Sequence, residues 1–283
     1  DCSGALDFAE YDASLEPYLD GSYFEDGVTS GRLSTPFSPG VDWGPEAECT
    51  EAEYQQLAAA WAAHLKERGW FERAIVYAAD EPDPSLYPRI AQHSSWMQAG
   101  DADWRSRIMV TTAPTTSNID VLGPAIGIFC VAPEEYDHWY QGNDEIFGRE
   151  EWPDLFATGT QLWFYESNNQ DYPYPTFASQ SLDGLESTMM LWAAWYERAT
   201  GFLYWDTTSW TDGEPWGPNN DYGKTGDGML IYPGNHDGLL APAGSPTDVA
   251  IEGPIPSYRL KMIRMGLQDF ALFQLAEQNN LGE

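Results

Sequence analysis

The sequence has few basic residues, and this scarcity excludes several classes of partner. Lysine and arginine together number 13 against 45 aspartates and glutamates, which gives a formal net charge of −32 at pH 7. Such a surface would repel phosphate groups almost everywhere, so we expect no binding to nucleic acid or to an anionic membrane. The acidic residues are spread along the chain, which is typical of a secreted acidic enzyme or of a protein kept soluble in high salt. We therefore expect a secreted or periplasmic protein, with the cytoplasm of a halophile as the alternative.

Cysteine and metal-binding patterns are also scarce. The three cysteines are Cys2, Cys49 and Cys130, and Cys130 lies in an apolar run where we expect a buried thiol. Cys2 and Cys49 could form a disulfide in an oxidising compartment. The four histidines are far apart in sequence and none lies in a zinc-type motif. The sequence therefore indicates no metal and no cofactor, it contains no apolar run of membrane-spanning length, and it does not reveal an oligomeric state.

Strand and helix signals alternate from residue 50 onward. Thr50 and Glu53 form a capping-box pattern, and the apolar positions that follow predict one face of a helix ending near Gly69. We expect further helices near 87–98, 182–199 and 257–278. We expect strands over 74–79, 108–110, 126–131, 161–165, 202–205 and 229–232. Repeated strand-then-helix units favour a parallel sheet or barrel.

The number of expected strands indicates whether the barrel is complete. Five of the expected strands are of the barrel type, and residues 32–37 form a plausible sixth before them. A closed eight-stranded barrel needs two more strands at the amino end, where residues 5–20 instead look like a helix. We therefore expect one catalytic domain over residues 1–283 with an α/β fold. It would be a (β/α)8-type TIM barrel that lacks its first strands and has about six in this chain.

The most informative stretch is the apolar run 74–79, which leads directly into Asp80, Glu81 and Pro82. Proline cannot continue a sheet and favours an extended conformation for the residue before it, so both acids should lie where the strand stops. In an α/β barrel the carboxyl ends of the strands form the active-site face. Adjacent acids in this place indicate acid/base chemistry on a neutral, oxygen-rich substrate. A solvated pair of acids with no role is the alternative.

Aromatic residues are abundant and several lie at strand ends or in loops. Trp163 and Tyr165 are two apart in an expected strand and should point the same way, while Trp205 and Trp210 follow a later strand. Tyr165 could donate a hydrogen bond to a substrate, and the tryptophans could wall a sugar pocket. Packing in the core is the alternative for each of them.

Taken together, these segments resemble glycoside hydrolase family 123. The run from Tyr77 to Pro82 is similar to the family's catalytic strand end. The resemblance continues in segments 163–166, 201–205, 214–216, 226–234 and 256–270. Family members are β-N-acetylgalactosaminidases, and they carry an upstream β-sandwich domain and first barrel strands that we expect to be missing here. The resemblance implies an exo-acting enzyme whose substrate is a glycan with a terminal β-linked N-acetylhexosamine, with N-acetylgalactosamine (GalNAc) preferred.

The adjacency of Asp80 and Glu81 bears on the mechanism. In the usual two-carboxylate glycosidase the acids face each other across the sugar, which neighbouring residues cannot readily do. Adjacent acids suit substrate-assisted hydrolysis with retention, which the resemblance also implies. Glu81 would then act as the acid and base, and Asp80 would hold the 2-acetamido group and stabilise the charge of an oxazolinium intermediate. The expected substrate-binding residues are Tyr77, Trp163, Tyr165, Glu166, Trp205 and Trp210.

Two alternatives remain open at this point. Glu166 ends the expected strand 161–165, and a retaining glycosidase of another specificity could use Glu81 as acid/base and Glu166 as nucleophile. Glu166 could instead bind sugar hydroxyls or form a structural salt bridge. The non-enzyme alternative is a degenerate barrel that binds carbohydrate. For Arg259 we expect an ion pair that braces loops.

Overall fold

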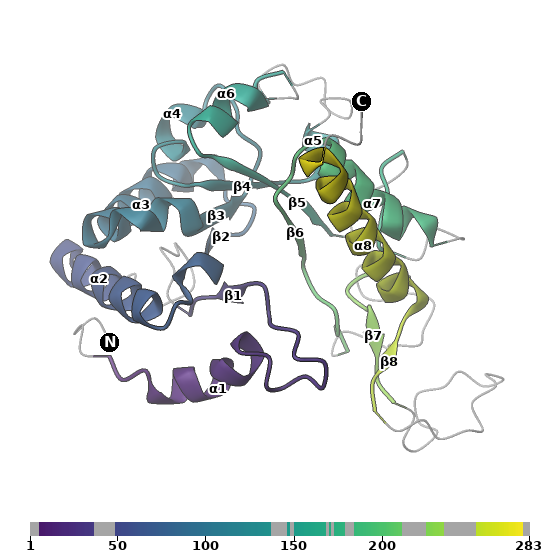
Figure 1. Cartoon of the computed structure of the whole chain (residues 1–283). Helices are drawn as coiled ribbons and strands as arrows, with labels where there is room; N and C mark the ends of the chain where they lie inside the picture. Colours follow the sequence, from purple (N-terminus) through teal and green to yellow (C-terminus); the bar gives the residue numbers. More distant parts are fainter. Residues whose placement is uncertain are drawn as a thin grey trace. The chain divides into compact units, whose positions relative to one another are not determined.

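The computed structural model describes residues 6–36, 49–136, 146–147, 150–167, 170, 173–178, 184–210, 225–234 and 253–279 (Figure 1). The chain divides into two compact units. The first comprises residues 1–130 and 143–161, and the second comprises residues 131–142 and 162–283.

A parallel sheet forms the centre of the first unit. Its strands follow the order β1 (Leu33–Ser34), β2 (Ala74–Ala79), β3 (Ile108–Thr111) and β4 (Ile128–Val131). Each neighbouring pair is parallel. All residues of β3 and β4 are buried, as expected for strands covered on both faces. The predicted strand over 74–79 is confirmed, whereas the described part of the predicted strand over 32–37 pairs at only two residues.

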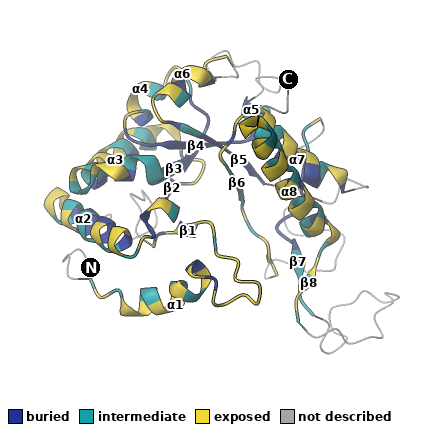
Figure 2. Ribbon diagram, viewed as in Figure 1, coloured by how far each residue is buried: buried dark blue, intermediate teal, exposed yellow. Residues whose placement is uncertain are grey.

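Among the described residues of the first unit, the three longer helices were expected from the sequence, whereas the two short helices were not. The larger ones are α1 (Ala9–Leu19), α2 (Glu51–Glu67) and α3 (Tyr87–Gly100), and the shorter ones are α4 (Ile119–Leu122) and α6 (Trp152–Ala157). The predicted capping box at the start of α2 is confirmed, because Thr50 accepts a hydrogen bond from the Glu53 N–H and the Glu53 carboxylate accepts one from the Thr50 N–H. One face of α2 is buried and the opposite face is exposed (Figure 2). The buried face contains the predicted residues Tyr54, Leu57, Ala58, Trp61 and Leu65.

The second unit contains the parallel pair β5 (Gln161–Glu166) and β6 (Gly201–Tyr204). Its two long helices, α7 (Leu185–Tyr196) and α8 (Tyr258–Gln278), pack along each other. Gly266 favours the close approach, since a Cβ atom there would lie 3.0 Å from the carbonyl oxygen of Thr188, a tight contact. The remaining elements are the short helix α5 (Pro133–Tyr136) and the antiparallel pair β7 (Ile231–Tyr232) and β8 (Ile255–Pro256).

An apolar cluster fills the space between the β5–β6 pair and the two long helices. Its buried members are Phe177, Met190, Leu191 and Leu230, and the partly buried side chains against it are Phe202, Tyr204, Leu260 and Ile263. Phe202 and Tyr204 are two apart on β6, so the same face of this strand pair packs on the helices.

The chain is therefore a mixed α/β protein with six strands in parallel pairs, four of them in the first unit and two in the second. Alternation of strands and helices, and the parallel pairing, agree with the expectation from the sequence. Among the described helices, even the longest, α8, lacks an apolar stretch of the length that a bilayer span requires.

Candidate active site

The two acids expected to be catalytic follow β2 directly, after an irregularity in the strand. Tyr77 pairs with Met109 on β3, but Val110 pairs with Ala79, so one extra residue of β2 is accommodated at Ala78. Such a bulge re-aims the side chains that follow it. In a regular strand, residues 77 and 80 would point to opposite faces; after the bulge, Tyr77 and Asp80 meet, and the Tyr77 hydroxyl donates a 2.5 Å hydrogen bond to Oδ1 of Asp80.

The Asp80 carboxylate is held on one of its two oxygens. Oδ1 also lies 3.1 Å from the hydroxyl of Thr111, a buried residue at the end of β3. Burial, and then the hydrogen bond to Asp80, raise the pKa of Tyr77 above its ordinary value, so its hydroxyl stays protonated and remains a donor. Among the described residues, both hydrogen bonds to Asp80 end on Oδ1, which leaves Oδ2 available to a ligand. Asp80 is itself exposed.

Glu81 has an unusual backbone conformation. Its φ is +42°, in the left-handed region that residues other than glycine disfavour. The expectation that Pro82 would keep Glu81 extended is therefore wrong. The conformation is held from β3, because the Glu81 N–H donates a 2.6 Å hydrogen bond to Oγ1 of Thr111. Glu81 is exposed, and backbone strain of this kind is often found at functional sites.

Cys130 lies beside this group, since its register partner on β3 is Thr111. The prediction of a buried thiol is confirmed, and the thiol is free. Burial, and then the charge of Asp80, raise the pKa of Cys130 well above its ordinary value, so the neutral thiol is favoured. Of the other two cysteines, Cys49 is disulfide-bonded and Cys2 lies outside the described residues.

A second group of polar side chains lies in the second unit around Glu166, the last residue of β5. The side chain is fully buried, and Oε1 accepts hydrogen bonds from the Thr176 hydroxyl at 2.5 Å and from the Phe177 N–H at 2.8 Å. Oε2 has no hydrogen-bond partner among the described residues. The pKa of Glu166 is raised to about 8, chiefly by burial; the nearby charge of Asp227 adds to the rise, and the hydrogen bonds from Thr176 and Phe177 oppose it. At neutral pH most molecules therefore hold this group as a neutral acid.

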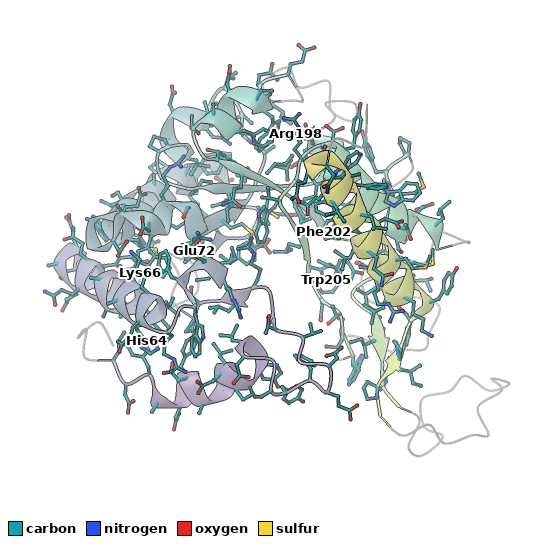
Figure 3. The ribbon with its side chains drawn as sticks, viewed as in Figure 1. His64, Lys66, Glu72, Arg198, Phe202 and Trp205 are labelled. Atoms are coloured by element: carbon teal, nitrogen blue, oxygen red, sulfur yellow. The ribbon has the colours of Figure 1, made fainter. Side chains whose placement is uncertain are left out.

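Asp227 organises the residues that follow β6. Its Oδ1 accepts a 2.8 Å hydrogen bond from the Tyr204 hydroxyl and a 3.0 Å bond from the indole N–H of Trp205. The Tyr204 oxygen accepts in turn from the Gly228 N–H at 2.7 Å. Gly228 has a φ of +69°, and a Cβ atom there would lie 2.5 Å from the Trp205 ring. The Asp227-Gly228 turn thus holds Trp205 in place just after β6, where Figure 3 labels it.

Arg259, near the start of α8, contacts the same region. Its buried guanidinium donates to the backbone carbonyls of Phe177, Gly226 at 2.6 Å and Met229 at 2.7 Å, and to the Tyr232 hydroxyl at 3.2 Å. It therefore braces loops as expected, but the expectation of an ion pair is wrong for the described part of the chain, where its partners are neutral oxygens. The described residues also contain no group of three or more His, Cys, Asp or Glu side chains that could hold a metal ion.

Residues 40–276 match the family model described as the glycoside hydrolase 123 catalytic domain. The chain belongs to glycoside hydrolase family 123. It is also similar in fold to a solved family 123 glycoside hydrolase from Clostridium perfringens, with a TM-score of 0.55 and 19% sequence identity. The alignment covers 85% of this chain and 38% of the other, whose structure was described in a study of glycolipid glycan hydrolysis. A comparison with curated proteins found no match.

The expected substrate-binding aromatic residues of this family 123 chain fall into two groups. Trp163 and Tyr165 are only 5% and 8% exposed, and the Trp163 ring packs where a side chain at Gly201 would lie. Trp205 and Trp210 keep 36% and 39% of their surfaces exposed. The Trp210 indole N–H donates a 2.9 Å hydrogen bond to the carbonyl oxygen of Ile231, so both exposed rings are held by their N–H groups.

Strand register separates Glu166 from the two buried aromatics on β5. Glu166 pairs with Tyr204 and lies on the face that packs on α7 and α8, whereas Trp163 and Tyr165 belong to the opposite face. Sequence reasoning missed three residues that organise the family 123 chain at these places, namely Thr111, Tyr204 and Asp227. Asp227 lies in a Gly-Asp-Gly turn within a segment that resembles the family, and this was the available signal.

Proposed function

We propose that this family 123 member is a retaining exo-β-N-acetylhexosaminidase that prefers GalNAc and works by substrate-assisted catalysis in a (β/α)8-type barrel. Membership of the family supports a glycosidase. The observation that carries the finer proposal is the geometry of Asp80. Its Oδ1 is fixed by Tyr77 and Thr111, Oδ2 remains available, and the exposed Glu81 is its immediate neighbour.

In the proposed first step, Asp80 accepts a hydrogen bond from the N–H of the 2-acetamido group. The carbonyl oxygen of that group attacks C1 of the sugar, the bond from C1 to the glycosidic oxygen breaks, and Glu81 gives its proton to the departing oxygen. The product is an oxazolinium ion, whose positive charge the Asp80 carboxylate stabilises. The two hydrogen bonds on Oδ1 hold the Asp80 carboxylate in one orientation for this task.

In the second step the roles reverse. The Glu81 carboxylate takes a proton from a water molecule, the water oxygen bonds to C1, and the bond from C1 to the acetamido oxygen breaks. The acetamido group is restored and the sugar leaves with its original anomeric configuration. Because the substrate supplies the nucleophile, no second carboxylate across the sugar is needed.

The rival mechanism, with Glu166 as nucleophile, is less favoured by the surroundings of that residue. Its carboxyl group is fully buried, it faces the α7–α8 side of β5, and its pKa of about 8 keeps it protonated at neutral pH. A nucleophile must be ionised and must reach the sugar. We therefore assign Glu166 a structural role through Thr176 and Phe177.

For the substrate we propose a glycan with a terminal β-linked GalNAc. The Clostridium perfringens relative, described as acting on a glycolipid glycan, supports a glycan substrate. Trp205 and Trp210, with their exposed rings, are the proposed stacking surfaces for sugar. We also propose a secreted or periplasmic location, which the disulfide at Cys49 supports because such bonds persist in oxidising compartments.

Hydrolysis of nitrophenyl β-glycosides of GalNAc, N-acetylglucosamine and galactose tests this proposal. We expect turnover of the GalNAc substrate and none of the galactoside. Glu81→Gln should abolish turnover of an unactivated disaccharide while retaining part of the activity on a dinitrophenyl glycoside, whose leaving group needs no proton. Turnover of the galactoside at a similar rate would overturn the substrate-assisted mechanism. Absence of turnover from folded protein would favour a carbohydrate-binding barrel instead.

A further inference from the structure

Thr111 carries a buried hydroxyl that the structure brings into contact with both Asp80 and Glu81. It ends β3, about thirty residues along the chain from the two acids, and its side chain points to the same side of the sheet as Tyr77. Its Oγ1 lies 2.6 Å from the Glu81 nitrogen and 3.1 Å from Oδ1 of Asp80.

The chemistry of a hydroxyl allows both contacts at once. A threonine hydroxyl has one hydrogen to donate and two lone pairs to accept with. The Glu81 N–H can only donate, so Oγ1 accepts there, and the Asp80 carboxylate can only accept, so the threonine hydrogen goes to Oδ1. The Tyr77 hydroxyl donates its own hydrogen to the same carboxylate oxygen. The group forms a directed chain from the Glu81 backbone through Thr111 to Asp80.

The same hydroxyl stabilises a backbone conformation that Glu81 would not otherwise prefer. A residue that precedes proline favours extended conformations with negative φ, yet Glu81 has a φ of +42°. A non-glycine residue in this conformation is strained, and the surrounding contacts must offset that strain. The 2.6 Å hydrogen bond from the Glu81 N–H to Thr111 acts directly on this peptide unit.

We infer that Thr111 is a positioning residue that sets the orientation of both acids, by fixing the backbone at Glu81 and the carboxylate of Asp80. This inference rests on the proposed function for its effect on turnover. The role belongs to the hydroxyl and not to the methyl group. Thr111→Val keeps the shape and removes the donor and acceptor, whereas Thr111→Ser keeps them.

The first test compares kcat and KM of Thr111→Val and Thr111→Ser on the GalNAc substrate. A misplacement of about 1 Å costs up to about 100-fold in rate, so we expect Thr111→Val to lower kcat by about 10- to 100-fold with KM changed less than about threefold. Thr111→Ser should recover most of that loss. Thr112→Val is the matched control, because its hydroxyl contacts Tyr87 and the Ala113 carbonyl and has no described contact with the acids. It should stay within about twofold of the parent.

Rates are normalised to the folded fraction from urea denaturation, so that loss of stability is separated from loss of positioning. An unchanged kcat in Thr111→Val, or a serine variant as slow as the valine variant, would overturn the inference. Crystal structures of the parent and of Thr111→Val provide a second readout that needs no activity. We expect Glu81 to return to a negative φ in the variant. A retained positive φ would overturn the inference, whereas an inactive parent with the expected change at Glu81 would overturn only the proposed function.

Discussion

Replacing Glu166 with glutamine should change how the stability of the protein depends on pH. Burial raises the pKa of Glu166 from its ordinary value of 4.5 to about 8. Below pH 4.5 this group is protonated in both the folded and the unfolded chain. Between pH 4.5 and about pH 8 the carboxyl group is ionised in the unfolded chain but keeps its proton in the folded chain. The free energy of unfolding therefore falls as the pH rises through this range. The slope is about 1.4 kcal/mol per pH unit, and the whole window amounts to at most about 5 kcal/mol.

The Glu166→Gln variant should lose this contribution. Glutamine keeps an oxygen that can accept from Thr176 and Phe177 but does not ionise, so the variant's stability should fall less steeply with pH. Urea denaturation of both proteins at unit steps between pH 5 and 8 measures the difference. The comparison of slopes removes the effect of the many other acids, which both proteins share. The exposed Glu10 on α1 offers a control, because Glu10→Gln should leave the slope as it is.

If the free energy of unfolding falls with pH at the same slope in the parent and in Glu166→Gln, the reasoning is refuted. Equal slopes would mean that Glu166 ionises in the folded protein as readily as in the unfolded chain, and that its surroundings are wetter than the structure describes. In that case Glu166 would again become a candidate nucleophile, because an ionised carboxylate at the end of β5 is what the rival mechanism requires.

Two further predictions concern the loops of the second unit. Arg259→Met should lower the free energy of unfolding by at least about 3 kcal/mol, because buried carbonyl oxygens lose their hydrogen-bond donors. Urea denaturation measures this loss, and Arg264→Met, at an exposed position of the same helix, is the control. A loss no larger than that of the control would contradict the prediction. Gly228→Ala should lower the free energy of unfolding more than Gly159→Ala does. Both glycines have positive φ, but only Gly228 is crowded by the Trp205 ring. The expected difference between the two losses of unfolding free energy is about 1–3 kcal/mol. The tryptophan fluorescence of Gly228→Ala should also change. Equal losses of unfolding free energy would contradict the prediction and show that the Trp205 ring can move aside.

Local sequence patterns predicted much of the fold. The capping box at Thr50 and the apolar face of α2 depend on residues within a few positions of one another, so their signal survives in the sequence alone. The strand 74–79 was also predicted to the residue, because its apolar, β-branched run is bounded on both sides by residues that end strands. Of the expected strand over 229–232, the structure forms β7 at Ile231 and Tyr232 only, and its two-residue partner β8 was not predicted.

The candidate site was only partly predictable, for a physical reason. Sequence adjacency identified Asp80 and Glu81, but the left-handed conformation of Glu81 depends on a hydroxyl from another strand, and the local preference set by Pro82 points the other way. The bulge at Ala78 likewise arises from pairing with β3. Glu166 was identified as a strand-end acid, yet its burial depends on Phe177 and the long helices, which no local pattern reports.

The most direct test of the account is the effect of fluorine in the N-acyl group of the substrate. The rates for nitrophenyl β-glycosides of GalNAc that carry acetyl, monofluoroacetyl, difluoroacetyl and trifluoroacetyl groups are compared under kcat/KM conditions. Fluorine withdraws electrons from the carbonyl oxygen that is proposed to attack C1, so the account predicts a steep fall in rate along this series. A rate that stays level along the series would contradict substrate-assisted catalysis by Asp80 and Glu81.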